Sequence, residues 1–96
     1  MKIIWDKKAH QDLNNNVSYI AKQSPQNAIK VLNTLLELPN SLKIFPFAYP
    51  KEPSFNNDNI RFIVKWSFKM VYFITDDIIY IMRVFNTSQH PNKIME

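Results

Sequence analysis

The fold is decided by residues 60–85, which read IRFIVKWSFKMVYFITDDIIYIMRVF. This stretch contains three runs rich in Ile, Val, Phe and Tyr, at 60–66, 68–75 and 77–85, and such runs are typical of β-strands. The links between them, Trp66-Ser67 and the turn around Asp76-Asp77, are so short that only antiparallel neighbours can form. Residues 60–85 therefore predict a three-stranded antiparallel meander. The alternating side chains that point to either face of the sheet are both largely apolar. We therefore expect a partner or a chain tail to cover the face on which the rest of the chain does not pack.

The amino-terminal segment predicts a short strand followed by a helix. Residues 2–5 are mostly apolar, and Asp6 is a favourable N-cap for the helix that follows. Apolar residues then recur at spacings of four, four and three, which predicts about four helical turns with one buried stripe. The stripe consists of Ala9, Leu13, Val17 and Ile20.

A second helix is expected directly after the first. Ser24 is a typical cap, and Pro25 suits the first helical position, where its missing N–H has no cost. Pro39 ends or bends this helix, whose apolar stripe consists of Ala28, Val31, Leu32 and Leu35. Because the link between the two helices is short, they must pack antiparallel as a helical hairpin.

Residues 42–59 have the composition of a loop. Three prolines break any regular pattern in this segment, and we expect its aromatic side chains to anchor it against the core. These side chains are Phe45, Phe47, Tyr49 and Phe55.

The predicted order is β-α-α-β-β-β, an α+β fold in which a helical hairpin packs on a small antiparallel sheet. The 96 residues are expected to form one domain, 1–96, because two cores would each be too small to offset chain entropy.

Composition excludes several classes of function. The chain has no cysteine and no glycine, which removes disulfides, thiolate chemistry, Gly-rich phosphate loops and the nucleophile elbow. The net charge of +4 suits an anionic partner such as nucleic acid or an acidic protein, and it equally suits solubility alone. The start of the chain does not resemble a signal peptide, and no apolar run is long enough to span a bilayer, so a cytoplasmic protein without a membrane partner is expected.

Metal and hydrolase chemistry are not favoured. His10 and His90 are the only histidines, and Asp76-Asp77 has the place of a turn, so we expect no metal and no cofactor. Neither histidine accompanies a constrained serine, which argues against a Ser-His-Asp triad. His90 could serve as a general acid in metal-independent RNA cleavage, but an ordinary surface histidine is the favoured interpretation.

Four cations lie within the predicted strands: Arg61, Lys65, Lys69 and Arg83. A cation among buried neighbours must reach water, a carboxylate or an anionic ligand. We expect the two lysines to extend to water at the sheet edge, and the two arginines to recognise phosphate or carboxylate. A two-residue loop at Trp66-Ser67 would put Arg61 and Lys65 on one face and Lys69 on the other, whereas a three-residue loop would align all three.

Several motifs in this order resemble the RelE/ParE superfamily, the toxins of bacterial toxin-antitoxin modules. The first helix and its cap read WDKKAHQDLNNNVSYIAKQSP at 5–25, where Trp5, Ala9, Asp12-Leu13 and Tyr19-Ile20, followed by Ala28, match the family's W, A, DL, YI and A. Further along come Leu42, FP at 45–46, IRF at 60–62, FKMVYFI at 68–74 and the closing IMRVFNTSQHPNKI at 81–94. The resemblance spans essentially the whole chain.

The resemblance implies a cognate antitoxin as partner, and a toxin that forms a homodimer or a toxin-antitoxin hetero-oligomer. It also implies a role in growth inhibition and plasmid stabilisation. RelE-like members cleave ribosome-bound mRNA with strand cations, a late arginine and a tyrosine or histidine. Arg61 and Lys69 lie near such positions, and Arg83 and His90 complete the candidate catalytic set. However, Ser88 stands where those members often have arginine, and no tyrosine follows Tyr80. This departure favours ParE-like toxins, which poison DNA gyrase without cutting RNA.

Three hypotheses follow from the sequence. The first is a ParE-like toxin that binds a replication target such as DNA gyrase. The second is a RelE-like ribosome-dependent mRNA endonuclease, and the third is an inactivated relative that acts only as a binding module. Whether the protein is an enzyme stays open at this stage. The residues expected to contact the target or nucleic acid are Arg61, Lys65, Lys69, Arg83, Ser88 and His90.

Overall fold

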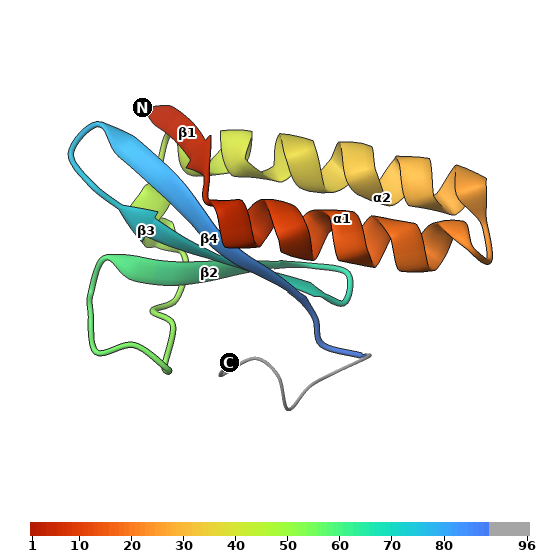
Figure 1. Ribbon diagram of the computed structural model, residues 1–96. Helices are drawn as coiled ribbons and strands as arrows, with labels where there is room; N and C mark the ends of the chain where they lie inside the picture. Colours follow the sequence, from red (N-terminus) through yellow and green to blue (C-terminus); the bar gives the residue numbers. More distant parts are fainter. Residues whose placement is uncertain (89–96) are drawn as a thin grey trace.

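The computed structural model describes residues 1–88, and its elements follow the predicted order (Figure 1). A strand precedes the two helices, and three strands follow them. The elements are β1 (Lys2–Trp5), α1 (Lys7–Ala21), α2 (Pro25–Glu37), β2 (Ile60–Lys65), β3 (Phe68–Ile74) and β4 (Ile78–Asn86). The connection from α2 to β2 contains two short 3-10 helices, Leu38–Leu42 and Pro46–Ala48. Within residues 1–88, no helix is both long enough and apolar enough to cross a bilayer.

Both helices begin where the sequence predicts. The Ser24 hydroxyl accepts a hydrogen bond from the Asn27 amide at 3.2 Å, so it caps α2 as expected. Asp6 occupies the N-cap position of α1, but within residues 1–88 its side chain forms no capping hydrogen bond. Its backbone fixes the junction instead, because its N–H donates to the Ile81 carbonyl at 2.9 Å.

The four strands form one sheet in the order β1-β4-β3-β2. Strands β2, β3 and β4 are the predicted antiparallel meander. In contrast, β1 pairs with β4 in parallel, which makes the sheet mixed. The helical hairpin brings the chain back toward β1, and the segment after α2 leads to β2 at the far edge of the sheet (Figure 1). The meander then places β4 beside β1, and the two strands run in the same direction.

The hairpin between β2 and β3 has the two-residue loop Trp66-Ser67, because Lys65 pairs directly with Phe68. Since cross-strand partners share a face, Lys69 lies on the same face as its partner Val64, opposite Arg61 and Lys65. Trp66 adopts a positive φ of 55°, in the left-handed region.

The main core lies between the helices and the sheet. Its buried side chains come from both helices, from the segment after α2 and from the three strands of the meander. The largest of those that are fully enclosed include Leu35, Leu42, Met70, Tyr72 and Ile81. A second, smaller cluster lies on the opposite face of the sheet and consists of Ile60, Val71 and Phe85, with Phe62, Phe73 and Met82 packed against it. We call this opposite face the outer face.

The expectation that aromatic side chains anchor the loop 42–59 is wrong for three of the four. Phe45, Phe47 and Phe55 are 70%, 51% and 41% exposed, and only Tyr49 packs against the main core. The loop buries a charged residue instead, Glu52, which is 2% exposed. The reason is tertiary, because Glu52 meets a cation that the sheet itself encloses.

Candidate functional site

The candidate site is the outer face of the sheet together with the cations along its edges. Register places Lys69 beside Phe85, and Arg83 beside Val71, so both cations belong to the outer face. Arg61 and Lys65 lie on the side of the helices, at the edge strand β2. The structure thus divides the four predicted cations between the two faces.

Lys69 is neutralised by a buried carboxylate. Its ammonium lies 2.6 Å from Glu52, with side-chain exposures of 12% and 2%, and 4.3 Å from the centroid of the Phe62 ring. The expectation that Lys69 extends to water at the sheet edge is wrong, because β3 is an inner strand flanked by β2 and β4. An enclosed ammonium requires a partner of opposite charge, which Glu52 supplies.

The Glu52 carboxylate is held by several donors. One oxygen, Oε1, accepts hydrogen bonds from the Ser54 amide at 3.3 Å and from the Ser54 hydroxyl at 2.8 Å. Burial alone would raise the pKa of Glu52, but the hydrogen bonds from Lys69 and Ser54 and the attraction of the ammonium outweigh burial and lower it. The pair therefore stays charged at neutral pH and fixes the loop on the outer face.

Arg83 recognises a carboxylate, as expected for arginine, but the carboxylate belongs to its own chain. Its Nε lies 2.8 Å from Asp12 Oδ2, and its Nη2 lies 3.1 Å from Oδ1, a bidentate pair between β4 and α1. The guanidinium also lies 4.7 Å from the centroid of the Phe85 ring. The strand cation is therefore part of the packing of α1 on the sheet.

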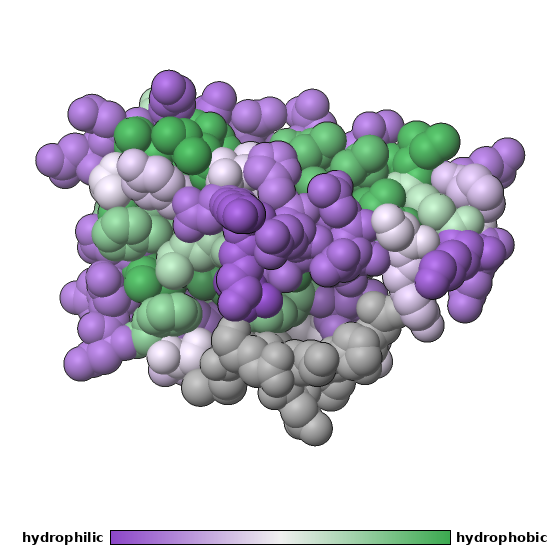
Figure 2. All heavy atoms as spheres, viewed as in Figure 1, coloured by the Kyte–Doolittle hydropathy of each residue, from purple (hydrophilic) through white to green (hydrophobic). Residues whose placement is uncertain are grey.

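Asp12 also closes an exposed strand edge. Because β1 ends opposite Ile81, the second half of β4 has no neighbouring strand on that side among residues 1–88. The Val84 amide there donates to Asp12 Oδ2 at 2.9 Å, so a side chain replaces the missing strand partner. Figure 2 shows hydrophilic side chains gathered where α1 and this half of β4 meet.

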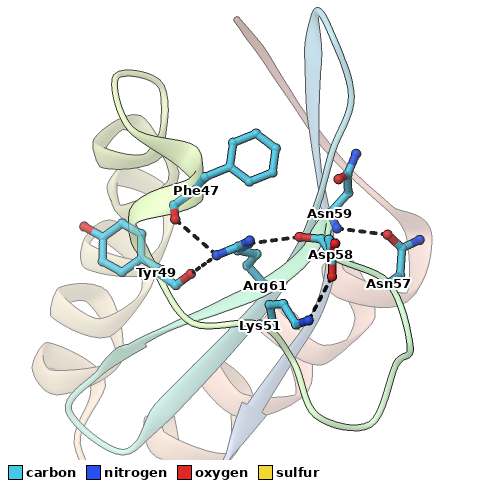
Figure 3. A network of polar contacts seen from close by, with 7 residues as sticks. All are labelled: Phe47, Tyr49, Lys51, Asn57, Asp58, Asn59 and Arg61. Carbon is cyan, nitrogen blue, oxygen red and sulfur yellow. Dashed lines mark hydrogen bonds and ion pairs between the residues drawn. The ribbon is translucent and has the colours of Figure 1, made fainter.

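Arg61 fastens the loop to the edge of the sheet (Figure 3). Its Nη1 donates to the carbonyls of Phe47 and Tyr49 at 3.1 and 2.9 Å, and its Nε donates to the Asp58 carbonyl at 3.0 Å. The guanidinium also stacks 5.1 Å from the Phe47 ring centroid. Beside it, the exposed Lys51 pairs with Asp58 at 2.8 Å and lowers the pKa of that carboxyl.

The remaining predicted site residues lie near the tip of the β2–β3 hairpin and the end of β4. Lys65 is exposed, which agrees with the expectation that it extends to water. Ser88 is exposed too, and its amide and hydroxyl both donate to Asn86 Oδ1, at 3.2 and 2.8 Å. His90 lies outside the described residues, so its predicted roles stay predictions.

Two observations bear on the chemistry that this site can perform. Tyr72 is fully buried, and burial raises its pKa well above the ordinary value, while its hydroxyl donates to the Pro46 carbonyl at 2.7 Å. Among residues 1–88, no cluster of His, Asp or Glu could hold a metal ion. The described part of the site presents ion-paired side chains and aromatic rings.

Sequence reasoning did not single out Asp12 or Glu52 as partners of the cations. Asp12 follows Ala9 by three residues, so a helical wheel puts it beside the apolar stripe, a weak signal that a charge faces the sheet. Glu52 stands between two prolines in a loop, where no periodicity indicates burial. Both partners are joined to their cations by contacts that only the folded chain creates.

A helical hairpin packed on a mixed four-stranded sheet defines a small α+β domain, in which two of the four strand cations, Lys69 and Arg83, pair with carboxylates of the same chain. The chain belongs to the ParE toxin family, since the model of that family, described as ParE toxin of the type II toxin-antitoxin system parDE, matches residues 3–91. The predicted likeness to the RelE/ParE superfamily is thereby confirmed. No curated protein matches the chain significantly by sequence.

Among solved structures, the chain is similar to one from the chromosomal ParDE toxin-antitoxin system of P. aeruginosa. The TM-score is 0.73, the sequence identity is 20%, and the match covers 90% of this chain and 95% of that one. At this identity the likeness concerns the fold, and it agrees with the β-α-α-β-β-β order predicted from sequence.

Proposed function

We propose that this ParE-family toxin inhibits growth by binding a replication protein, with DNA gyrase as the expected target, and that a cognate antitoxin protein neutralises it. The family match supports a type II toxin, and the similar ParDE structure comes from a toxin-antitoxin system. The proposed site of action is the cytoplasm, and the proposed mechanism needs no cofactor and no bond cleavage.

The pairing of the strand cations carries the choice of binding over RNA cleavage. A nuclease of this fold would need cations free to stabilise the charge that develops on a phosphate in the transition state. Here Lys69 is paired with Glu52, and Arg83 with Asp12, while Arg61 donates to three loop carbonyls. An ammonium already neutralised at 2.6 Å contributes little field to an incoming phosphate.

The proposal is tested by inducing the protein in growing cells and following growth, plasmid supercoiling and transcript ends together. Growth arrest with altered supercoiling and intact transcripts is the expected result. Purified protein should likewise inhibit supercoiling by purified gyrase. If transcripts are cut within minutes at ribosomal A-site codons while supercoiling stays normal, the protein is an mRNA endonuclease and the proposal fails. If growth continues with the folded protein present, the chain is an inactivated relative.

The contribution of the exposed Lys65 to growth inhibition is tested with a charge reversal. Lys65→Glu should weaken growth inhibition, because Lys65 is exposed at the tip of the hairpin and its charge is available to a partner. Lys22→Glu makes the same change at an exposed position at the end of α1 and serves as the matched control. Equal loss in both variants would indicate an effect of net charge rather than of the site.

The antitoxin is tested by co-expression of the short gene adjacent to the toxin gene. Its product should restore growth and purify together with the toxin, and the mass of the complex gives its stoichiometry. Toxin purified alone would show by the same measurement whether it is a monomer or a homodimer. Growth that the neighbouring product does not restore would contradict its role as antitoxin.

A further inference from the structure

A pocket of about 320 Å³ opens between the tip of the β2–β3 hairpin and the ends of the helices that meet at the α1–α2 turn. Its buried part is formed by Val31 and Phe68, which are 5% and 4% exposed. Lys30, Trp66 and Asn86 line its open part. We call it the Trp66 pocket, and it is separate from the outer face of the sheet.

Trp66 has an unusual backbone and an unusual exposure. Its φ of 55° lies in the left-handed region, which is unfavourable for a bulky residue and which turns of this kind usually assign to glycine or asparagine. Its side chain is 50% exposed, so burial of the indole does not account for its presence. A strained residue that keeps a large aromatic ring at the surface indicates a binding role.

Two cations accompany the indole. The ammonium groups of Lys30 and Lys65 lie 5.8 and 5.2 Å from its ring centroid. In the part of the chain that the structure describes, neither forms an ion pair, in contrast to Lys69 and Arg83 on the outer face. Two ammonium groups without an ion pair among residues 1–88 thus lie beside an exposed aromatic ring and the pocket.

We propose that the Trp66 pocket binds an acidic segment of a partner polypeptide. A carboxylate of the segment is held by Lys30 and Lys65, and a neighbouring apolar side chain enters the cavity against Phe68 and the indole. The net charge of +4 favours approach of such a segment. The proposal rests on the pocket alone and does not depend on gyrase as the target.

The shape and lining favour a peptide over a nucleic acid. A single strand of nucleic acid is bound along an extended row of cations, whereas here two cations lie beside the indole and only one of them, Lys30, lines the pocket. The cavity is at the small end of the range for ligand sites, and its buried part, formed by Val31 and Phe68, suits one side chain. Asn27 and Asn86 line the same pocket and offer amide groups that can pair with a peptide backbone.

The experiment is an NMR titration of the ¹⁵N-labelled full chain with the blocked peptide Glu-Leu-Glu-Phe-Leu-Glu-Glu. The indole N–H of Trp66 and the amides of Lys30 and Asn86 should shift and saturate, while the indole of Trp5 stays in place. Lys30→Gln and Lys65→Gln should each weaken binding about two- to fivefold, as is usual for exposed charge pairs. Trp66→Gly, which suits the left-handed backbone, should weaken it further. Lys8→Gln, exposed on the first turn of α1, is the matched control and should bind as the unmodified chain does.

Three outcomes would overturn the proposal. The first is equal binding of a peptide with Gln in place of every Glu, which would exclude a role for the carboxylates. The second is binding that neither lysine variant weakens, or no binding at millimolar peptide. The third is tighter binding of a single-stranded oligothymidylate with the same shifts, which would identify the pocket as a nucleic-acid site. Urea unfolding of each variant shows whether the comparison is made on folded protein.

Discussion

Replacing Asp12 by alanine is expected to destabilise the fold by about 2–3 kcal/mol, because one carboxylate satisfies three donors at the junction of α1 and β4. Arg83 donates to it through Nε and Nη2, and the Val84 amide donates through the exposed edge of β4. The substitution leaves the guanidinium without its carboxylate and the amide without its acceptor.

The magnitude follows from how enclosed the pair is. Breaking a fully buried ion pair costs about 3–5 kcal/mol, and an exposed pair contributes about 0–1 kcal/mol. The side chains of Arg83 and Asp12 are 19% and 15% exposed, so the pair lies nearer the buried limit but retains some contact with water. Water can also reach the freed Val84 amide at the strand edge, which keeps the loss below the upper limit.

Equilibrium unfolding in urea measures the effect. With a slope of about 1–3 kcal/mol per M for a small protein, a loss of about 2–3 kcal/mol lowers the midpoint by about 0.7–3 M. A double-mutant cycle with Arg83→Met isolates the coupling free energy between Asp12 and Arg83. Arg83→Lys retains the positive charge but cannot form the two parallel hydrogen bonds of the guanidinium. A loss below about 0.5 kcal/mol for Asp12→Ala, with no coupling in the cycle, would refute the view that this pair holds α1 on the sheet.

Three further predictions concern the buried pair, the loop and the core. Folding lowers the pKa of Glu52 from its ordinary value near 4.5. The contribution of the charged carboxylate to the free energy of unfolding is therefore fully present above pH 4.5, and it is lost as the pH falls through the lower pKa of the folded state. The urea midpoint should therefore fall more steeply below pH 4.5 in the unmodified chain than in Glu52→Gln. Asp58→Asn, which removes an exposed ion pair, should leave the dependence of the midpoint on pH nearly unchanged. Identical pH dependence in all three proteins would contradict a stabilising role for the Glu52 carboxylate. Arg61→Ala should free the loop at residues 43–59, with faster trypsin cleavage there under native conditions, and unchanged cleavage would mean that the carbonyl contacts do not hold it. Leu35→Ala, at a fully buried position, should lower the free energy of unfolding by about 2–5 kcal/mol. Leu36→Ala, at a 43% exposed position, should lower it far less. Similar melting temperatures for the two variants would contradict the described core.

Local features of the fold were readable from the residues because the physics that sets them is local. The caps and apolar stripes located α1 and α2 within a residue or two, since helix ends and buried faces depend on neighbours three or four positions apart. The links between the last three strands required an antiparallel meander. The sequence left two alternatives for the β2–β3 hairpin, a two-residue or a three-residue loop, and the structure has the two-residue loop.

The candidate site was less readable, because its charges are neutralised by distant partners. Arg83 and Asp12 are separated by 71 positions in the chain, and no periodic pattern connects positions so far apart. Lys69 was expected to reach water, yet it lies on an inner strand and pairs with Glu52 from a proline-rich loop. Lys65, which is exposed near the tip of a hairpin, follows the expectation from local sequence alone.

The sequence by itself determined the order of elements, the α+β class and the family, because each depends on short-range patterns or on motifs in a fixed order. Only the tertiary structure decided that β1 pairs in parallel with β4, and which cations remain available to a partner. The physical reason is that a buried charge requires an opposite charge in space, and the fold chooses that partner without regard to distance along the chain. The same folding left Lys30 and Lys65 beside Trp66 without a carboxylate among residues 1–88, and so placed two ammonium groups without an ion pair near the hairpin tip.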